Sequence, residues 1–138
     1  MNISTDKDLI LFVDDEKICH SLVELIIPNF TKYRLISAFS GSEALMYAKR
    51  YGNNISLILS DIIMPDMNGF EIYSILSQNP NFENIPFIFQ SGYSEQERDL
   101  LHYTESLKPK ILYKPYSKED LLEQIKIVSN NNLNSKKN

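Results

Sequence analysis

The sequence predicts an α/β protein whose doubly wound, five-stranded parallel sheet carries helices on both faces. Three observations support this fold class. Apolar runs alternate with amphipathic stretches five times along the chain, the segments between them are short, and the apolar run at 55–59 has no polar face. A strand without a polar face is typical of a parallel sheet buried on both sides, and helical crossovers usually connect adjacent parallel strands.

The first two strands and helices are predicted from the N-terminal third. Residues 8–13, DLILFV, contain a continuous apolar run that is followed by acidic residues, as expected of a buried strand. The helix after it, at 17–27, has apolar residues at helical spacing and is expected to stop at Pro28. A short run rich in aliphatic and aromatic residues, at 33–39, predicts the second strand, and the second helix begins at Gly41.

The middle of the chain continues the alternation. The third strand, at 55–59, delivers a lone carboxylate, Asp61, at its C-terminal end. A turn at 65–69, composed largely of Pro, Asp, Asn and Gly, reverses the chain, and a helix follows until the break at 79–80. The apolar run at 86–89 predicts the fourth strand.

The last helix and strand pairs complete the pattern. A polar, weakly amphipathic helix precedes the fifth strand, at 110–113. Ser117 fits the N-cap of the last helix, with Asp120 three residues on, where a capping box carries Glu or Gln. The helix is expected to end near residue 128. Residues 1–129 are therefore predicted to form one domain and residues 130–138 a flexible tail.

The composition agrees with one globular domain. The chain has 138 residues, 43% of them apolar and 23% charged, which are ordinary values for a soluble protein. The net charge is −4 without a basic stripe, so we expect no direct nucleic-acid binding. No apolar run approaches the ~20 residues that span a bilayer, and no signal-peptide pattern opens the chain, so a cytoplasmic location is expected. Cys19 is the only cysteine, which rules out an intrachain disulfide.

Reactive side chains follow four of the five predicted strands. Asp14 and Asp15 come after the first strand, Asp61 after the third, Ser91 after the fourth and Lys114 after the fifth. In the flavodoxin-like strand order 2-1-3-4-5, the second strand is an edge and the other four ends are neighbours. Ligands bind outside the carboxyl ends of such sheets. We therefore expect these sequence-distant groups to form one pocket.

The chemistry of that pocket suits a divalent cation and a phosphoryl group. Three carboxylates raise one another's pKa values unless cations balance them. Their oxygen atoms favour Mg²⁺ or Mn²⁺, held by Asp15 and Asp61, with Asp14 acting through a water molecule. Lys114 and the Ser91 hydroxyl would each bind a phosphoryl oxygen. In-line phosphoryl transfer needs this arrangement, with Asp61 as the nucleophile that forms an acyl phosphate.

Four motifs in this order resemble the receiver domain of two-component response regulators, and the resemblance covers about residues 9–128. They are DDE at 14–16, SDIIMPDMNG at 60–69, SGY at 91–93 and KP at 114–115. The resemblance implies phosphoryl transfer to Asp61 from a histidine kinase or a histidine phosphotransfer protein. It also implies Mg²⁺ bound by Asp15, Asp61 and the backbone carbonyl of Ile63, movement of Ser91 toward the phosphate, and a cis Lys114–Pro115 peptide.

The resemblance further implies a switch that catalyses only its own phosphorylation and dephosphorylation, rather than an enzyme. In this family, the surface made by helix four, strand five and helix five, here residues 94–128, docks a downstream protein or a second copy in a homodimer. No output domain is visible after the last predicted helix in these 138 residues. We expect either a stand-alone receiver or a receiver excised from a larger regulator or hybrid kinase.

Two positions depart from the family pattern. The aromatic residue expected three positions before the lysine is Ile111 here, and Tyr113 on the same strand is predicted to substitute for it in part. Ile63 and Tyr93 occupy positions that in this family modulate the attack of water on the phosphoaspartate. Both side chains are bulky, so we predict slow autodephosphorylation.

Three other functions are compatible with parts of the pattern. A flavodoxin-type cofactor protein needs a Ser, Thr or Gly-rich loop after the first strand, where this chain is acidic. An aspartyl phosphatase typically carries a second Asp two residues after its nucleophile, where this chain has Ile63. A phosphorylation-independent interaction module of the same fold is the remaining alternative. The complete set of acceptor residues argues against it, and Ile111 argues for it.

Each candidate residue also has a purely structural explanation. Asp14 and Asp15 suit a helix N-terminus, Asp61 a turn, Ser91 a loop and Lys114 a solvated strand end. Their coincidence at matching strand ends favours the functional explanation. His20 and His102 are expected to be surface or partly packed groups. Three further side chains are expected to be packing residues rather than redox sites: Cys19, Met64 and Met67.

Overall fold

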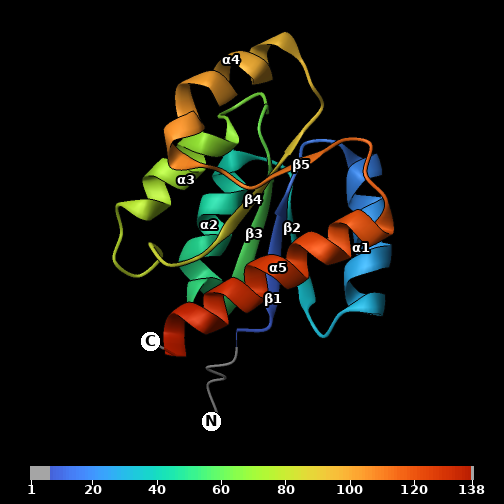
Figure 1. Cartoon of the computed structure of the whole chain (residues 1–138), viewed down its shortest axis with the longest axis vertical. Coiled ribbons are helices and arrows are strands. Elements are labelled where there is room, and N and C mark those ends of the chain that lie inside the picture. The colour runs from blue at the N-terminus through green and yellow to red at the C-terminus, as the bar shows by residue number, and fades with distance from the viewer. Residues whose placement is uncertain (1–6, 138) are drawn as a thin grey trace.

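A computed structural model of the chain describes the backbone of residues 7–137 and the side chains of residues 7–130. Strands and helices alternate along it (Figure 1). The strands are β1 (Leu9–Val13), β2 (Arg34–Ala38), β3 (Ile55–Asp61), β4 (Phe87–Ser91) and β5 (Ile111–Tyr113). The helices are α1 (Lys17–Phe30), α2 (Gly41–Tyr51), α3 (Gly69–Ser77), α4 (Glu95–Thr104) and α5 (Lys118–Lys137), with 3-10 turns at Gly52–Asn54 and Glu105–Leu107.

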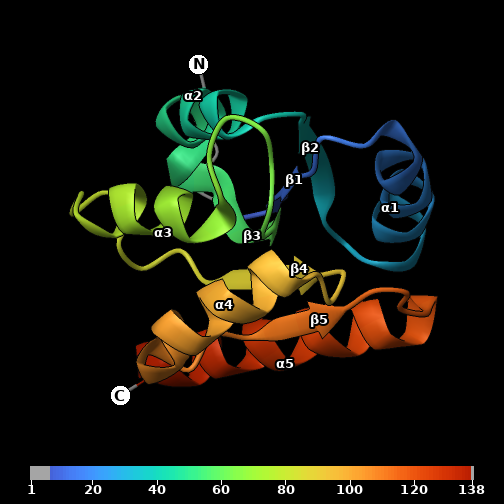
Figure 2. The same ribbon diagram turned by 90° about the horizontal axis from the view of Figure 1, so that it is seen from above.

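All five strands pair in parallel in the order β2-β1-β3-β4-β5, which confirms the predicted topology. The three central strands are almost wholly buried, whereas the edge strands β2 and β5 are partly exposed. Figure 2 shows helices on both sides of the sheet. The runs without a polar face are therefore central strands covered on two faces, as the sequence predicts.

Alternate residues of each strand supply two separate cores. In β1, Leu11 and Val13 face the core shared with α2 and α3, while Ile10 and Phe12 face the core shared with α1 and α5. Side chains of a strand alternate between its faces, so a continuous apolar run fills both cores at once. Because β1 is packed on both faces, the position of its C-terminal end, where Asp14 follows, is fixed relative to the neighbouring strands.

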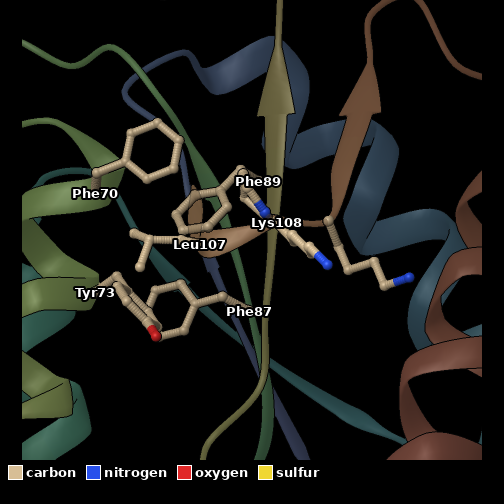
Figure 3. Close-up of a pocket in the computed structure, with 8 residues that line it drawn as sticks. Phe70, Tyr73, Phe87, Phe89, Leu107 and Lys108 are labelled. Carbon is tan, nitrogen blue, oxygen red and sulfur yellow. The ribbon is translucent and has the colours of Figure 1, made fainter. Parts of the chain in front are cut away.

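Aromatic rings pack between α3 and β4 (Figure 3). Phe70 of α3 lies 4.5 Å from Phe89, centroid to centroid, and Tyr73 lies 5.3 Å from Phe87 with its ring edge-on. Leu107, from the 3-10 turn before β5, reaches toward these rings and helps to line a cavity of about 150 Å³. The packing anchors α3 firmly against the sheet.

Two helix ends differ from the sequence prediction. The helix expected to stop at Pro28 continues to Phe30, because a proline in the last turn removes only its own donor while the Thr31 amide still bonds the Ile27 carbonyl at 3.0 Å. At the other end of the chain, α5 is helical to Lys137, past the predicted end. The flexible tail predicted at 130–138 stays a prediction, and residue 138 lies outside the described residues.

Local hydrogen bonds explain two other features of the fold. Ser117 and Asp120 bind each other's backbone amides at 3.0–3.1 Å, so the acidic residue completes the cap as expected. In the loop after β3, the Gly69 amide bonds the Ile62 carbonyl at 2.8 Å. A Cβ on Gly69 would lie 2.5 Å from the Asp61 carbonyl oxygen. Only glycine fits this close return of the loop to the end of β3.

Candidate functional site

The candidate residues predicted from the sequence lie at the C-terminal ends of neighbouring strands, along one side of the sheet. Register places Val13 beside Ser60, Asp61 beside Gln90, and Ser91 beside Tyr113. The residues that follow β1 and β5 are therefore brought to the end of β3. Of the predicted groups, Asp14, Asp61 and Lys114 are in direct contact here.

One ammonium group links two of the predicted carboxylates. Lys114 Nζ lies 3.2 Å from Asp14 Oδ2 and 3.3 Å from Asp61 Oδ1. The peptide after Lys114, to Pro115, is cis, which agrees with the resemblance. Lys114 is thus an ion-pair partner in the pocket and not a solvated strand end.

Asp14 is fully buried and held by several donors. Its Oδ1 accepts from the Glu16 amide at 2.9 Å, and its Oδ2 accepts from Gln90 Nε2 at 2.7 Å as well as from Lys114. Glu16, which precedes α1, makes no side-chain capping bond, and the first turn of α1 contains no acid. One oxygen of Asp14 therefore bonds the amide that precedes α1, while the other joins Gln90 and Lys114, so the start of the helix does not account for this carboxylate alone.

Gln90 and Tyr116 belong to the same network, and the sequence analysis missed both. The Tyr116 hydroxyl donates to Gln90 Oε1 at 2.7 Å. Gln90 is fully buried, and its Nε2 in turn donates to Asp14 Oδ2. Burial raises the pKa of Tyr116 well above its usual range, so its hydroxyl remains a donor. The sequence did contain one sign of this network, which is the polar Gln90 near the end of the apolar strand β4.

Asp61 ends β3 with its side chain 8% exposed. Burial and the charge of Asp14 raise its pKa to about 7, against the opposing effect of Lys114. Burial also disfavours the charged form of Lys114, but Asp61 and Asp14 outweigh it and raise the lysine pKa. The pocket therefore holds two acids and one cation, and it favours a further positive charge.

The rim beside this pocket carries the metal candidates. Carboxylate oxygens of Asp14, Asp15 and Glu16 lie within 4.8 Å of one another, and Asp15 and Glu16 are exposed. Hard oxygen donors of this kind fit Mg²⁺ or Mn²⁺. The carboxylate of Asp61 is not part of this close cluster, and Glu16 was not among the predicted ligands. Ile63, whose carbonyl the resemblance implies as a ligand, is half-buried in the loop after β3.

Ser91 is buried at the end of β4, but its hydroxyl bonds a residue that the sequence analysis did not single out. Ser91 Oγ donates to Glu97 Oε2 at 2.5 Å, and the Gly92 amide donates to the same oxygen at 2.6 Å. The Tyr93 amide bonds Ser91 Oγ at 3.2 Å. Ser91 is therefore fixed within a local network and is not a free loop serine.

The prediction that His20 lies at the surface or is partly packed was wrong. The ring is 2% exposed and stacks on Phe39 with centroids 3.9 Å apart. Its Nε2 lies 2.6 Å from the Asp14 carbonyl oxygen, which can only accept, so Nε2 carries the proton. The spacing of apolar residues in α1 does not indicate that the His20 ring is buried and bonds the Asp14 carbonyl. His102 is exposed, as expected.

Cys19 lies beside the lysine of the pocket. Its Sγ is 3.8 Å from Lys114 Nζ. Burial and the nearby Asp14 raise the pKa of the thiol to about 11, so the sulfur stays protonated and unreactive near neutral pH. This agrees with the packing role expected for it.

Comparisons with known proteins agree with the geometry. The family model of the response regulator receiver domain matches residues 10–126. A probable cyclic di-GMP phosphodiesterase of Vibrio cholerae is 41% identical over 71 residues, which are 51% of this chain and 16% of that protein. The response regulator SaeR of Staphylococcus aureus is 29% identical over 120 residues, which are 84% of this chain and 48% of that protein. The chain thus spans less than half the length of these two relatives.

A solved structure shows the same arrangement of strands and helices. The chemotaxis response regulator CheY4 of Vibrio cholerae matches with a TM-score of 0.75 and 25% identity, over 87% of this chain and 97% of that one. In the described part of this chain, no helix is both long and apolar enough to cross a membrane. The sheet order, the acidic pocket with its lysine, and the family match lead to one conclusion: this chain belongs to the response regulator receiver domain family.

Proposed function

We propose that this chain is a phosphoacceptor in two-component signal transduction and that Asp61 takes the phosphoryl group. The observation that carries the proposal is the Lys114 ammonium shared between Asp14 and Asp61 at the carboxyl end of the sheet. An acyl phosphate on Asp61 would place new negative charge beside this ammonium. Positioning and charge neutralisation supply most of the catalysis of phosphoryl transfer.

The reaction is an in-line displacement. A carboxylate oxygen of Asp61 attacks the phosphorus of a phosphohistidine on a histidine kinase or a histidine phosphotransfer protein. The P–O bond forms as the P–N bond breaks, and the electron pair of the broken bond stays on the imidazole nitrogen, which takes a proton from solvent. Hydrolysis later returns Asp61 to a carboxylate and releases phosphate.

The chain's own residues would hold Mg²⁺ or Mn²⁺ through Asp14, Asp15, Asp61 and the carbonyl of Ile63. The donor set fits, because carboxylate and carbonyl oxygens suit these hard cations and the pocket has one cation for two buried acids. The bound cation would offset the charge of the phosphoryl oxygens. Lys114 would bind one phosphoryl oxygen and the Ser91 hydroxyl another.

Residues 1–129 would act as the receiver, and the output surface would be α4, β5 and α5, which dock a downstream protein or a second copy. Tyr113 supports a role for this surface, because its ring stacks on Tyr93 with centroids 4.6 Å apart and both rings are exposed. The stack joins β5 to the loop after Ser91. Substitution of Tyr113 by Ala should weaken phosphorylation-dependent binding of a partner.

The direct test is intact mass after incubation with acetyl phosphate and Mg²⁺, on wild type and Asp61→Asn in parallel. We expect the wild type alone to gain one phosphoryl group, and chelation of the metal to abolish the gain. A phosphoryl half-life of seconds in the same sample would contradict the predicted slow autodephosphorylation.

A second candidate function is a phosphorylation-independent interaction module of the same fold. Ile111 favours it, because the family's aromatic residue is absent from that position. The same experiment separates the two functions. If the folded wild type gains no mass, the interaction module is the better explanation.

A further inference from the structure

Glu97 is a buried acid that the phosphoryl chemistry above leaves unused. It lies in the first turn of α4, is 6% exposed, and is the only buried residue of that helix. Its neighbours Glu95 and Arg98 are exposed. Charged side chains are seldom buried unless hydrogen bonds offset the loss of hydration. The partners of Glu97 therefore indicate its role.

Those partners are two donors at the end of β4. Glu97 Oε2 accepts from Ser91 Oγ at 2.5 Å and from the Gly92 amide at 2.6 Å. Hydrogen bonds to a charged acceptor are shorter and stronger than neutral ones. They tie the first turn of α4 to the strand that pairs with Asp61.

Helix capping does not explain this contact. At the start of α3, Asn68 and Glu71 form a capping box in which each side chain binds the other's backbone amide at 2.9 Å. The start of α4 has the same spacing, and Ser94 Oγ does accept from the Glu97 amide at 3.1 Å. The carboxylate of Glu97, however, reaches past the cap to the end of β4.

Little else holds α4 in place. Leu100 and Leu101 are partly buried against the core, and the other residues of the helix apart from Glu97 are exposed or half-buried. By contrast, α1 and α3 each bury four residues. Figure 1 shows α4 at one end of the molecule. A helix with so few buried contacts opens readily when an anchoring contact is lost.

We propose that Glu97 is a positioning residue that holds the Ser91 hydroxyl and the Gly92 amide in the unphosphorylated chain and gives them up when Asp61 is phosphorylated. This inference rests on the proposed function. A phosphoryl group brings strong acceptor oxygens and nearly two negative charges, so it competes for the same kind of donor and repels the Glu97 carboxylate. Ser91 Oγ turns to a phosphoryl oxygen, and the first turn of α4 is released.

The electrostatics and the neighbouring contacts fit this exchange. Burial and Asp14 are the main causes of the raised pKa of Asp61, and the charge of Glu97 adds to them, so the two carboxylates already oppose each other. The Tyr93 amide bonds Ser91 Oγ, and the Tyr93 ring stacks on Tyr113. Movement of Ser91 therefore reaches β5 without an aromatic residue at position 111.

The test compares Glu97→Gln with Glu95→Gln, which removes the same charge from an exposed position in the same turn. Two quantities are measured in each: the rate of phosphorylation by acetyl phosphate and Mg²⁺, followed by intact mass, and hydrogen exchange of the α4 amides without a phosphoryl donor. Because an amide is a weaker acceptor than a carboxylate, we expect Glu97→Gln to be phosphorylated about tenfold faster. Its α4 amides should exchange as fast as those of the phosphorylated wild type.

A third protein separates a role through Ser91 from a general loosening of the helix. In a Ser91→Ala background, Glu97→Gln should no longer accelerate phosphorylation, whereas a merely structural effect would persist. Should Glu97→Gln fail to fold, Glu97→Asp keeps the charge but is one methylene shorter, and it should show the same acceleration.

The outcomes distinguish the two proposals. If the wild type is phosphorylated but Glu97→Gln matches Glu95→Gln in rate and in exchange, the role of Glu97 is disproved and the phosphoacceptor function stands. If the folded wild type takes no phosphoryl group, both proposals fail.

Discussion

Lys114 is the only cation in direct contact with two buried acids among the described residues of the pocket. Burial and Asp14 raise the pKa of Asp61 to about 7, although Lys114 opposes them. A proton on Asp61 or a bound cation therefore completes the charge balance. The proton and the bound cation should compete, because each neutralises the charge of the same Asp61 carboxylate.

The raised pKa of Asp61 has a measurable effect on the metal-free protein. The folded chain binds this proton more tightly than an unfolded chain, whose ordinary aspartate pKa is 3.8. The resulting stabilisation is complete below about pH 4 and is lost as the pH rises through about 7. Urea unfolding with a chelator should show that the stability of the wild type falls relative to Asp61→Asn across that range. A difference that does not change with pH would contradict the raised pKa.

Tyr116 gives a second prediction at this scale. Tyr116→Phe leaves Gln90 Oε1 buried without its donor, so we expect a loss of about 1–3 kcal/mol in the free energy of unfolding, measured with urea. The control is Tyr113→Phe, which removes the hydroxyl of an exposed ring. Equal losses in the two variants would show that the Tyr116 hydrogen bond does not contribute.

At the scale of residues, the sequence identified the side chains whose type already indicates chemistry. Asp14, Asp61 and Lys114 were predicted as one pocket, and the structure brings them within hydrogen-bond distance. Gln90 and Glu97 were missed. An uncharged amide at the end of an apolar strand, or an acid at a capping position, acquires its partner only through tertiary structure.

At the scale of elements, the loop between β3 and α3 depends on one close approach. A methyl group at Gly69 would meet the Asp61 carbonyl oxygen at 2.5 Å, whereas one at Gly92 would lie 3.9 Å from its nearest neighbour, Glu97 Oε1. We expect Gly69→Ala to cost about 1–3 kcal/mol of stability and to slow phosphorylation, because the backbone of the nucleophile must shift. Gly92→Ala should be close to wild type in unfolding and in intact mass. Similar effects in both would mean that the loop relaxes freely.

The helix starts show what local sequence can and cannot specify. Ser117 followed by Asp120 three residues later correctly marked the start of α5. The capping box of Asn68 and Glu71 at the start of α3 was not predicted.

Ser94 and Glu97 at the start of α4 have the same spacing, but the Glu97 carboxylate bonds Ser91 and Gly92 at the end of β4 instead. The Glu97 carboxylate can bond either the backbone at the start of α4 or the donors at the end of β4. The distance between α4 and β4, which is a tertiary property, determines which of the two bonds forms.

At the scale of the whole molecule, the central strand carries both cores. Ile58 and Leu59 are adjacent on β3, fully buried, and face opposite sides of the sheet. We expect Ile58→Ala and Leu59→Ala each to cost about 2–5 kcal/mol in urea unfolding, because each leaves a cavity in a different core. Ile75→Ala, at a residue 49% exposed on α3, is the control and should cost far less. If only one central variant were costly, the sheet would be buried on one face alone.

The fold class, strand order and strand positions were predictable because the same pattern repeats along the chain. A run buried on two faces has no polar alternation, and few topologies accommodate three such central strands and two edge strands joined by helices. The ends of α1 and α5 were less predictable. The last turn of α1 is closed by a single hydrogen bond, from the Thr31 amide to the Ile27 carbonyl, which hydrophobic periodicity does not report.

The stacked rings of Tyr93 and Tyr113 also give this protein an optical property. The chain contains no tryptophan, so tyrosine emission is not lost by energy transfer to an indole ring. The pair lies on the surface, joined to Ser91 through the Tyr93 amide. We expect a rearrangement of Ser91 that separates the two rings to change their contribution to the emission of the eight tyrosines, which can be followed without a label.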